Sequence, residues 1–68
     1  MAPVRSLAEL RFKAGKDENY KKLAIMAAQN LGGTYTTLDE AMRWLETNAT
    51  ETDEEGVVEE INFVRDLV

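Results

Sequence analysis

Apolar side chains recur every three to four residues in three parts of the chain after residue 16, and this spacing predicts three helices. The first begins near Asp17 and Glu18, because acidic side chains favour a helix start both as caps and through the macrodipole. Its apolar positions are Tyr20, Leu23, Ala24, Ala27 and Leu31. Apolar residues also lie off this stripe, at Ile25 and Met26, which predicts burial on more than one side. Gly32 and Gly33 supply a left-handed stop.

The second and third of these patterns each begin with a capping box. Thr37 precedes Glu40 by three residues, and Thr52 precedes Glu55 in the same way, so each pair predicts a helix start. The apolar positions that follow Thr37 are Leu38, Ala41, Met42 and Leu45. In the acidic C-terminal helix predicted over 51–68 they are Val57, Val58, Ile61, Val64, Leu67 and Val68.

The segment 8–14 fits a helix and a strand equally well by its pattern. As a helix it would be capped by Ser6 and would bury Leu7, Leu10 and Ala14, leaving Phe12 outside. As a strand it would turn Leu10, Phe12 and Ala14 to one side, and Glu9, Arg11 and Lys13 to the other. Because burial of a phenylalanine contributes about 1.5–3 kcal/mol, the strand is favoured.

An isolated strand needs a partner for its backbone amides and carbonyls, and a second copy of the same strand would supply one across a two-fold axis. The predicted fold is therefore mainly α, with a short N-terminal strand, two core helices and an acidic C-terminal helix in an intertwined dimer. Within the single domain 1–68, residues 1–7 form an arm and 8–47 the core. The alternative is a monomeric three- or four-helix bundle whose first helix replaces the strand.

The order of the segments AELRFKA, DENYKKLAIMAAQNL, GGTYTT and TLDEAMRWLE resembles the ribbon-helix-helix family of Arc-type repressors and antitoxins over residues 8–47. In that family the outward side chains of the paired strands enter the major groove of double-stranded DNA. The resemblance implies that Glu9, Arg11 and Lys13 would do so here. It also implies that Thr36 and Thr37 would hold the DNA backbone.

The same resemblance implies a role for the C-terminal helix, since antitoxins of this family block a basic toxin with a C-terminal segment. The side chains that would bind such a basic protein partner are Val57, Val58, Ile61, Val64 and Leu67. The alternative, which we favour, is that these residues complete the chain's own core.

Charge is divided unevenly along the chain, whose net charge is −5. Residues 1–36 carry six basic and three acidic side chains, whereas residues 37–68 carry two basic and ten acidic ones. Such a division suggests different partners for the two parts.

Composition narrows the function classes further. The chain has no cysteine, no histidine and no phosphate-binding glycine loop, so we expect no enzyme, no cofactor and no metal site. No segment has the length of a membrane span or the apolar stretch of a signal peptide, and a cytoplasmic location is expected. Two hypotheses remain: a small DNA-binding transcriptional regulator, antitoxin-like and homodimeric, or a non-enzymatic acidic helical module or inhibitor that binds another protein.

Overall fold

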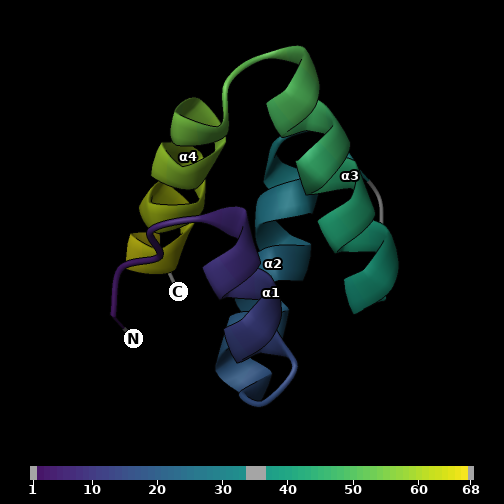
Figure 1. The fold of residues 1–68 in the computed structure, drawn as a ribbon. Coiled ribbons are helices and arrows are strands. Elements are labelled where there is room, and N and C mark those ends of the chain that lie inside the picture. The colour runs from purple at the N-terminus through teal and green to yellow at the C-terminus, as the bar shows by residue number, and fades with distance from the viewer. Residues whose placement is uncertain (1, 34–36, 68) are drawn as a thin grey trace.

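A computed structural model describes residues 2–33 and 37–67, and in these residues all regular structure is helical. The helices are α1 (Leu7–Ala14), α2 (Glu18–Asn30), α3 (Leu38–Glu51) and α4 (Glu54–Leu67). Figure 1 shows α3 and α4 on opposite sides of α2, with α1 in front of it. Because α2 packs against each of the other three helices, it is buried on several sides, as its apolar pattern predicted. The chain is mainly α, and its described helices fit the helical bundle of the alternative prediction.

The prediction of a strand over residues 8–14 is wrong, because these residues form α1. Ser6 caps the helix, its Oγ accepting a hydrogen bond from the Glu9 amide at 3.1 Å. Leu7, Leu10 and Ala14 are buried, as the helical alternative required. The hydrogen bonds of a helix are made within the segment itself, so no second chain is needed to pair its backbone. The intertwined dimer was predicted because a strand would need a partner, and α1 removes that reason.

The aromatic side chain that favoured the strand is exposed. Phe12 keeps 63% of its surface accessible, and its ring lies 4.4 Å from the Lys16 ammonium, a cation–π contact. The cap and three buried contacts of α1 thus outweigh the loss of one buried phenylalanine.

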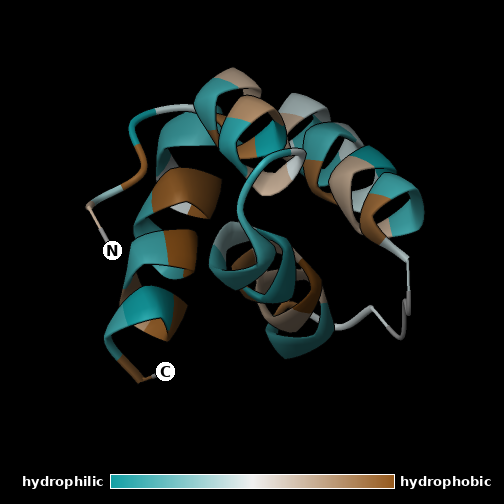
Figure 2. Cartoon of the chain, turned by 90° about the horizontal axis from the view of Figure 1, so that it is seen from below, coloured by the Kyte–Doolittle hydropathy of each residue, from teal (hydrophilic) through white to brown (hydrophobic). Residues whose placement is uncertain are grey.

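The core lies between the four helices. Figure 2 shows apolar stretches of α4 turned toward the other helices. The largest side chains with no exposed surface are Leu10, Leu23, Met42, Leu45 and Ile61. They come from all four helices, so each helix is needed to close the core. The favoured alternative for the C-terminal helix, that its apolar side completes the chain's own core, agrees with this burial.

The caps predicted for the two middle helices are present. Asp17 accepts a hydrogen bond from the Asn19 amide at 2.8 Å, and Thr37 accepts one from the Glu40 amide at 3.4 Å. At the end of α2, Gly32 takes the left-handed conformation with a φ of 117°, which only glycine adopts without strain. The left-handed stop, predicted at Gly32 and Gly33, is confirmed at Gly32.

The C-terminal helix is capped one residue after the predicted cap, Thr52. Thr52 ends α3, its amide donating to the Asn48 carbonyl at 2.9 Å and its hydroxyl to the same oxygen at 2.8 Å. Asp53 takes the capping role, because its carboxylate accepts a hydrogen bond from the Glu55 amide at 3.3 Å. As a result α3 and α4 meet at a tight corner.

The N-terminal arm is tied to the bundle through its backbone. The Val4 amide donates to Asn62 Oδ1 at 2.8 Å, and the Val4 carbonyl accepts from Asn62 Nδ2 at 2.9 Å. The Val4 side chain is buried in the core cluster. The arm therefore closes the core beside α4.

Candidate functional site

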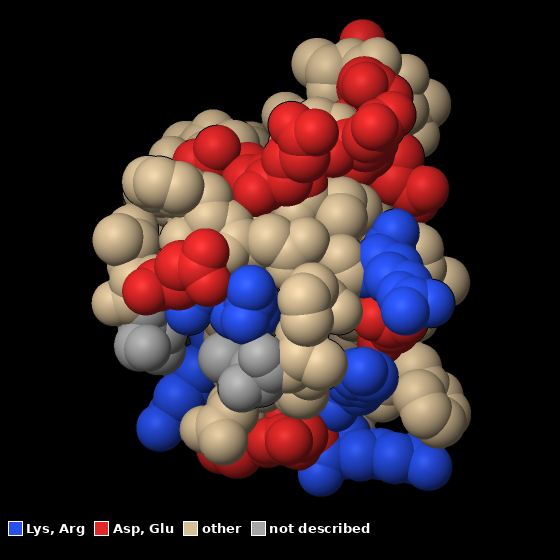
Figure 3. Space-filling view, turned by 90° about the vertical axis from the view of Figure 1, so that its left-hand side faces the viewer, with Lys and Arg blue, Asp and Glu red and all other residues tan. Residues whose placement is uncertain are grey.

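The corner between α3 and α4 concentrates exposed carboxylates. We call Glu51, Asp53, Glu54, Glu55 and Glu59 the acidic corner; all five are exposed. Figure 3 shows acidic side chains gathered along the upper part of the molecule, with basic and acidic side chains interspersed below. None of the ion pairs found among the described residues involves any of the five. Their charges therefore add to a negative potential at one end of the bundle.

The helix dipoles differ in their effect on this corner. Glu54 and Glu55 lie in the first turn of α4, where negative charge is stabilised. Glu51 lies in the last turn of α3, which carries no basic side chain, and there negative charge is unfavourable. A cation placed near Glu51 would offset both its charge and the negative end of α3.

A groove between α1 and α3 opens beside the acidic corner. It encloses about 770 Å³ and is lined by Leu7, Ala8, Arg11, Phe12, Glu46, Ala49, Thr50 and Glu54. Its apolar lining residues are Leu7, Ala8, Phe12 and Ala49, while Glu54 belongs also to the acidic corner. We call it the α1–α3 groove. It places an exposed aromatic ring next to a negatively charged rim.

Arg11 bridges the two helices that form this groove. Its guanidinium donates to the Glu46 carboxylate through Nη2 at 3.0 Å and Nε at 3.3 Å, and Asp39 lies 4.0 Å away. The hydrogen bond to Glu46, followed by the charges of Glu46 and Asp39, raises the pKa of Arg11 above its ordinary value. The guanidinium therefore stays charged, and its charge is matched within the chain.

Removal of this bridge is expected to change stability little. Arg11 and Glu46 keep 46% and 44% of their side-chain surface exposed, and exposed ion pairs contribute about 0.2–1 kcal/mol. Arg11→Gln should lower the free energy of unfolding by no more than about 1 kcal/mol, and less in high salt, where the pair is screened. Urea denaturation measures this, with Lys22→Gln on the exposed side of α2 as a control. A loss of several kcal/mol would mean that Arg11 has a buried structural role.

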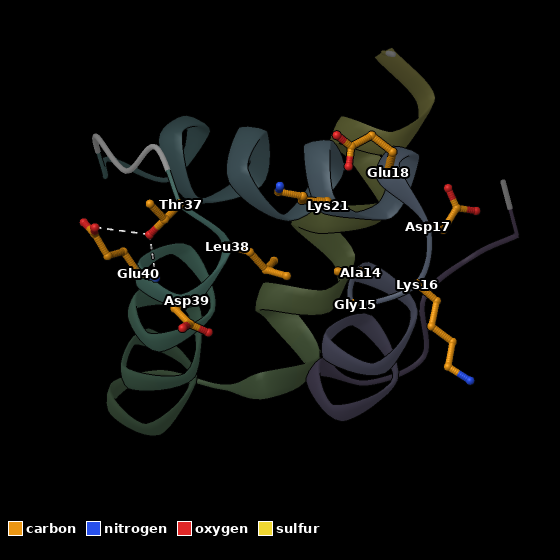
Figure 4. Close-up of a pocket in the computed structure, with 10 residues that line it drawn as sticks. All are labelled: Ala14, Gly15, Lys16, Asp17, Glu18, Lys21, Thr37, Leu38, Asp39 and Glu40. Carbon is orange, nitrogen blue, oxygen red and sulfur yellow. Dashed lines mark hydrogen bonds between the residues drawn. The ribbon is translucent and has the colours of Figure 1, made fainter.

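A second hollow, of about 850 Å³, lies where α2 and α3 begin (Figure 4). Four carboxylates line it beside Lys16 and Lys21; they are Asp17, Glu18, Asp39 and Glu40. The Thr37 hydroxyl donates to the Glu40 carboxylate at 3.1 Å and accepts from the Glu40 amide, so it is occupied as a cap. An anion entering here would meet more negative than positive side chains, which makes the hollow a poor phosphate site.

The three residues predicted to read DNA do not share one face. Glu9 and Lys13, four residues apart, lie side by side with 3.9 Å between carboxylate and ammonium, as helical spacing dictates. Lys13 also lies over the Tyr20 ring, 5.3 Å from its centroid. Arg11 turns instead to α3. Thr36, predicted with Thr37 to hold the DNA backbone, lies outside the described residues.

Four of the five residues predicted to bind a protein partner are buried. Val57, Val58, Ile61 and Val64 have 0–9% of their surface exposed, so a partner could reach them only by displacing α4. Leu67 is the exception at 68%.

Two further large apolar side chains are exposed. Phe63, which the sequence reasoning did not name, is 56% exposed, and Met26, whose place off the apolar stripe predicted burial, is 40% exposed. The helical spacing places Phe63 outside the buried stripe of α4, because it follows Ile61 by two residues. That signal was available in the sequence. Among the described residues, the large apolar side chains exposed to a partner are therefore Phe12, Met26, Phe63 and Leu67.

Comparison with known proteins identifies no relative, since no protein-family model, no curated protein and no solved structure matches this chain. Within residues 2–33 and 37–67, no helix is long and apolar enough to cross a membrane. In the same residues, no three or more aspartate or glutamate side chains are arranged so that they could hold a metal ion. The surface chemistry of the bundle is therefore the basis on which a function can be proposed.

Proposed function

We propose that this chain is a non-enzymatic helical interaction module that binds a basic segment of another protein through its acidic corner. The observation that carries the proposal is the set of five exposed carboxylates at the corner of α3 and α4, none of them in an ion pair among the described residues. Complementary charge speeds encounter and selects partners of the opposite sign. The partner's lysine and arginine side chains would supply the cations that the corner lacks.

The local helix geometry also favours a cationic partner. Only Thr52 and Asp53 separate α3 from α4, so the carboxylates are held on ordered backbone rather than on a long loop. A cation bound there interacts favourably with the carboxylates and with the negative end of α3. The same arrangement suits an inhibitor that imitates the charge of DNA.

The regulator hypothesis has less support. Its reading residues were to lie together on a paired strand, whereas Glu9 and Lys13 lie apart from Arg11 on a helix. Arg11 is already paired with Glu46, and phosphate binding depends on cations free to replace counterions. The homodimer and the DNA contact were both predicted from a strand over residues 8–14. The helical bundle offers no other observation that supports either of them.

The test is neutralisation of three corner carboxylates. The triple variant Glu51→Gln, Glu54→Gln and Glu55→Gln keeps Asp53 as the cap of α4. At about 0.2–1 kcal/mol for each exposed pair, affinity for a fluorescein-labelled lysine- and arginine-rich peptide should fall roughly 3- to 150-fold at low salt. Fluorescence anisotropy measures the affinity, and circular dichroism checks the fold. The difference should nearly vanish in about 1 M salt, where the Debye length is about 3 Å.

The control for this experiment is Glu18→Gln, which neutralises an exposed carboxylate in the first turn of another helix, α2. It should leave the affinity within about twofold of the unmodified chain, because a distant surface charge is screened. Equal affinities for the triple variant and the unmodified chain at low salt would refute the proposed site.

A further inference from the structure

The α1–α3 groove is apolar on one side and acidic at one end. Phe12 and Ala8 contribute to it from α1 and Ala49 from α3, and Glu54 brings the acidic corner to its rim. In protein interfaces, anchoring side chains fill well-packed pockets of the partner, and an apolar hollow can serve as such a pocket. The proposed function depends on the charge of the acidic corner, and the groove beside it provides a hollow into which a partner's side chain can fit.

Phe12 is the most informative side chain of the groove. It is 63% exposed, whereas Leu7, Leu10 and Ala14 on the inner face of α1 are buried. Its described ring contact is the Lys16 ammonium at 4.4 Å, which leaves the groove side of the helix open. Aromatic side chains are the residues that most often carry binding energy when a partner covers them.

The Arg11 bridge limits the length of the groove. Arg11 spans from α1 to Glu46, and the second hollow, lined by Gly15 and Leu38, lies beyond it along both helices. From Leu7 to Phe12 the helix rises about 8 Å at 1.5 Å per residue. This length accommodates one or two side chains from neighbouring turns of a helix, and it is too short for a long extended peptide.

We infer that the α1–α3 groove binds a basic amphipathic helix, and this inference rests on the proposed function. One or two apolar side chains of the helix enter the groove against Phe12. Its lysine or arginine side chains face Glu54 and the rest of the acidic corner. The choice of a basic partner follows from charge: Arg11 is matched by Glu46, so Glu54 is left as the unpaired charge of the groove among the described residues.

The probe for this inference is a designed leucine- and lysine-rich amphipathic helical peptide. Its control is a peptide of the same composition, scrambled so that leucine and lysine no longer occupy separate faces. Titration of the ¹⁵N-labelled chain with the amphipathic peptide should shift the amide resonances of Ala8, Phe12, Ala49 and Glu54. The scrambled peptide should bind more weakly and shift mainly the residues of the acidic corner.

The matched variants are Phe12→Ala and Phe63→Ala. Both remove an exposed phenylalanine, with 63% and 56% of its surface accessible, but Phe63 lies on α4 and does not line the groove. Phe12→Ala should weaken binding of the amphipathic peptide about tenfold or more, as expected for an aromatic anchor, without changing the salt dependence. Phe63→Ala should leave the affinity unchanged.

The outcomes separate this inference from the proposed function. If the triple corner variant weakens binding while Phe12→Ala does not, the corner attracts basic peptides and the groove inference is wrong. Equal binding of the two peptides, or loss of binding in Phe63→Ala alone, would also overturn the groove. If neither peptide binds at low salt, both the groove and the proposed function fail.

Discussion

Replacement of Ile61 by alanine is expected to lower the free energy of unfolding by about 2–5 kcal/mol. Ile61 has no exposed surface and belongs to the core cluster that α4 completes with the other three helices. Truncation removes three buried carbon atoms and leaves a cavity that packed neighbours fill only in part. A domain of this size has a total stability of roughly 3–10 kcal/mol, so the loss is a large fraction of it. Thermal and urea denaturation followed by circular dichroism measure the effect.

The matched control lies on the same helix. Leu67→Ala also removes a branched aliphatic side chain, but Leu67 is 68% exposed, so its loss should change stability by less than about 0.5 kcal/mol. This comparison decides what the apolar side of α4 does. Small and equal losses for both variants would mean that α4 is not part of the core and that its valines are available to a partner.

Asn62→Ala is expected to have the second largest effect, about 1–3 kcal/mol. The carboxamide of Asn62 makes two hydrogen bonds with the backbone of Val4, at 2.8 and 2.9 Å, and so holds the arm against α4. Alanine would leave the partly buried amide and carbonyl of Val4 without these partners. The arm would then detach or remain with unsatisfied polar groups, and either outcome lowers stability.

Asn30→Ala serves as the control for this prediction. Asn30 Nδ2 donates to Glu60 Oε1 at 2.7 Å, a short hydrogen bond but an exposed one, so water can replace it. Its removal should change the free energy of unfolding by at most about 0.5 kcal/mol. Hydrogen exchange adds a local measure, since the Val4 amide should lose protection in Asn62→Ala alone. A protected Val4 amide in that variant would show that the arm is held by other contacts.

The elements that the sequence predicted well are those whose signals are local. Asp17 and Thr37 cap α2 and α3 because a side-chain oxygen two or three residues before a free amide forms a hydrogen bond whatever the rest of the chain does. Gly32 marks the end of α2 for an equally local reason, its left-handed backbone. The apolar stripe of α4 predicted the buried side of that helix, at Val57, Ile61 and Val64.

The error over residues 8–14 has a tertiary cause. Leu10 and Ala14 lie on the inner side of the segment in both a helix and a strand, so the choice depended on whether Phe12 would be buried. In the packed bundle Leu7 is buried on the same side as Leu10 and Ala14, as the helical alternative required, and Phe12 stays exposed. The local evidence for a helix, Ser6 followed by Glu9, was present but was given less weight than one aromatic ring.

The candidate site could be predicted only in part. The excess of carboxylates after residue 37 was evident from the sequence and suggested different partners for the two parts of the chain, whereas a basic partner was implied only by the family resemblance. The α1–α3 groove could not be predicted, because it forms between residues as far apart in sequence as Arg11 and Glu46. Arg11 was predicted to contact DNA, but in the structure it pairs with Glu46 and bridges two helices.

The measurement that tests the central claim most directly is the set of ¹³Cα secondary chemical shifts of residues 7–14 in solution. These shifts are positive in helices and negative in strands, and they do not depend on any partner. The bundle predicts positive values through Leu7–Ala14. Negative values from Glu9 to Lys13 would restore the paired strand, and with it the DNA-binding dimer in place of the acidic interaction module.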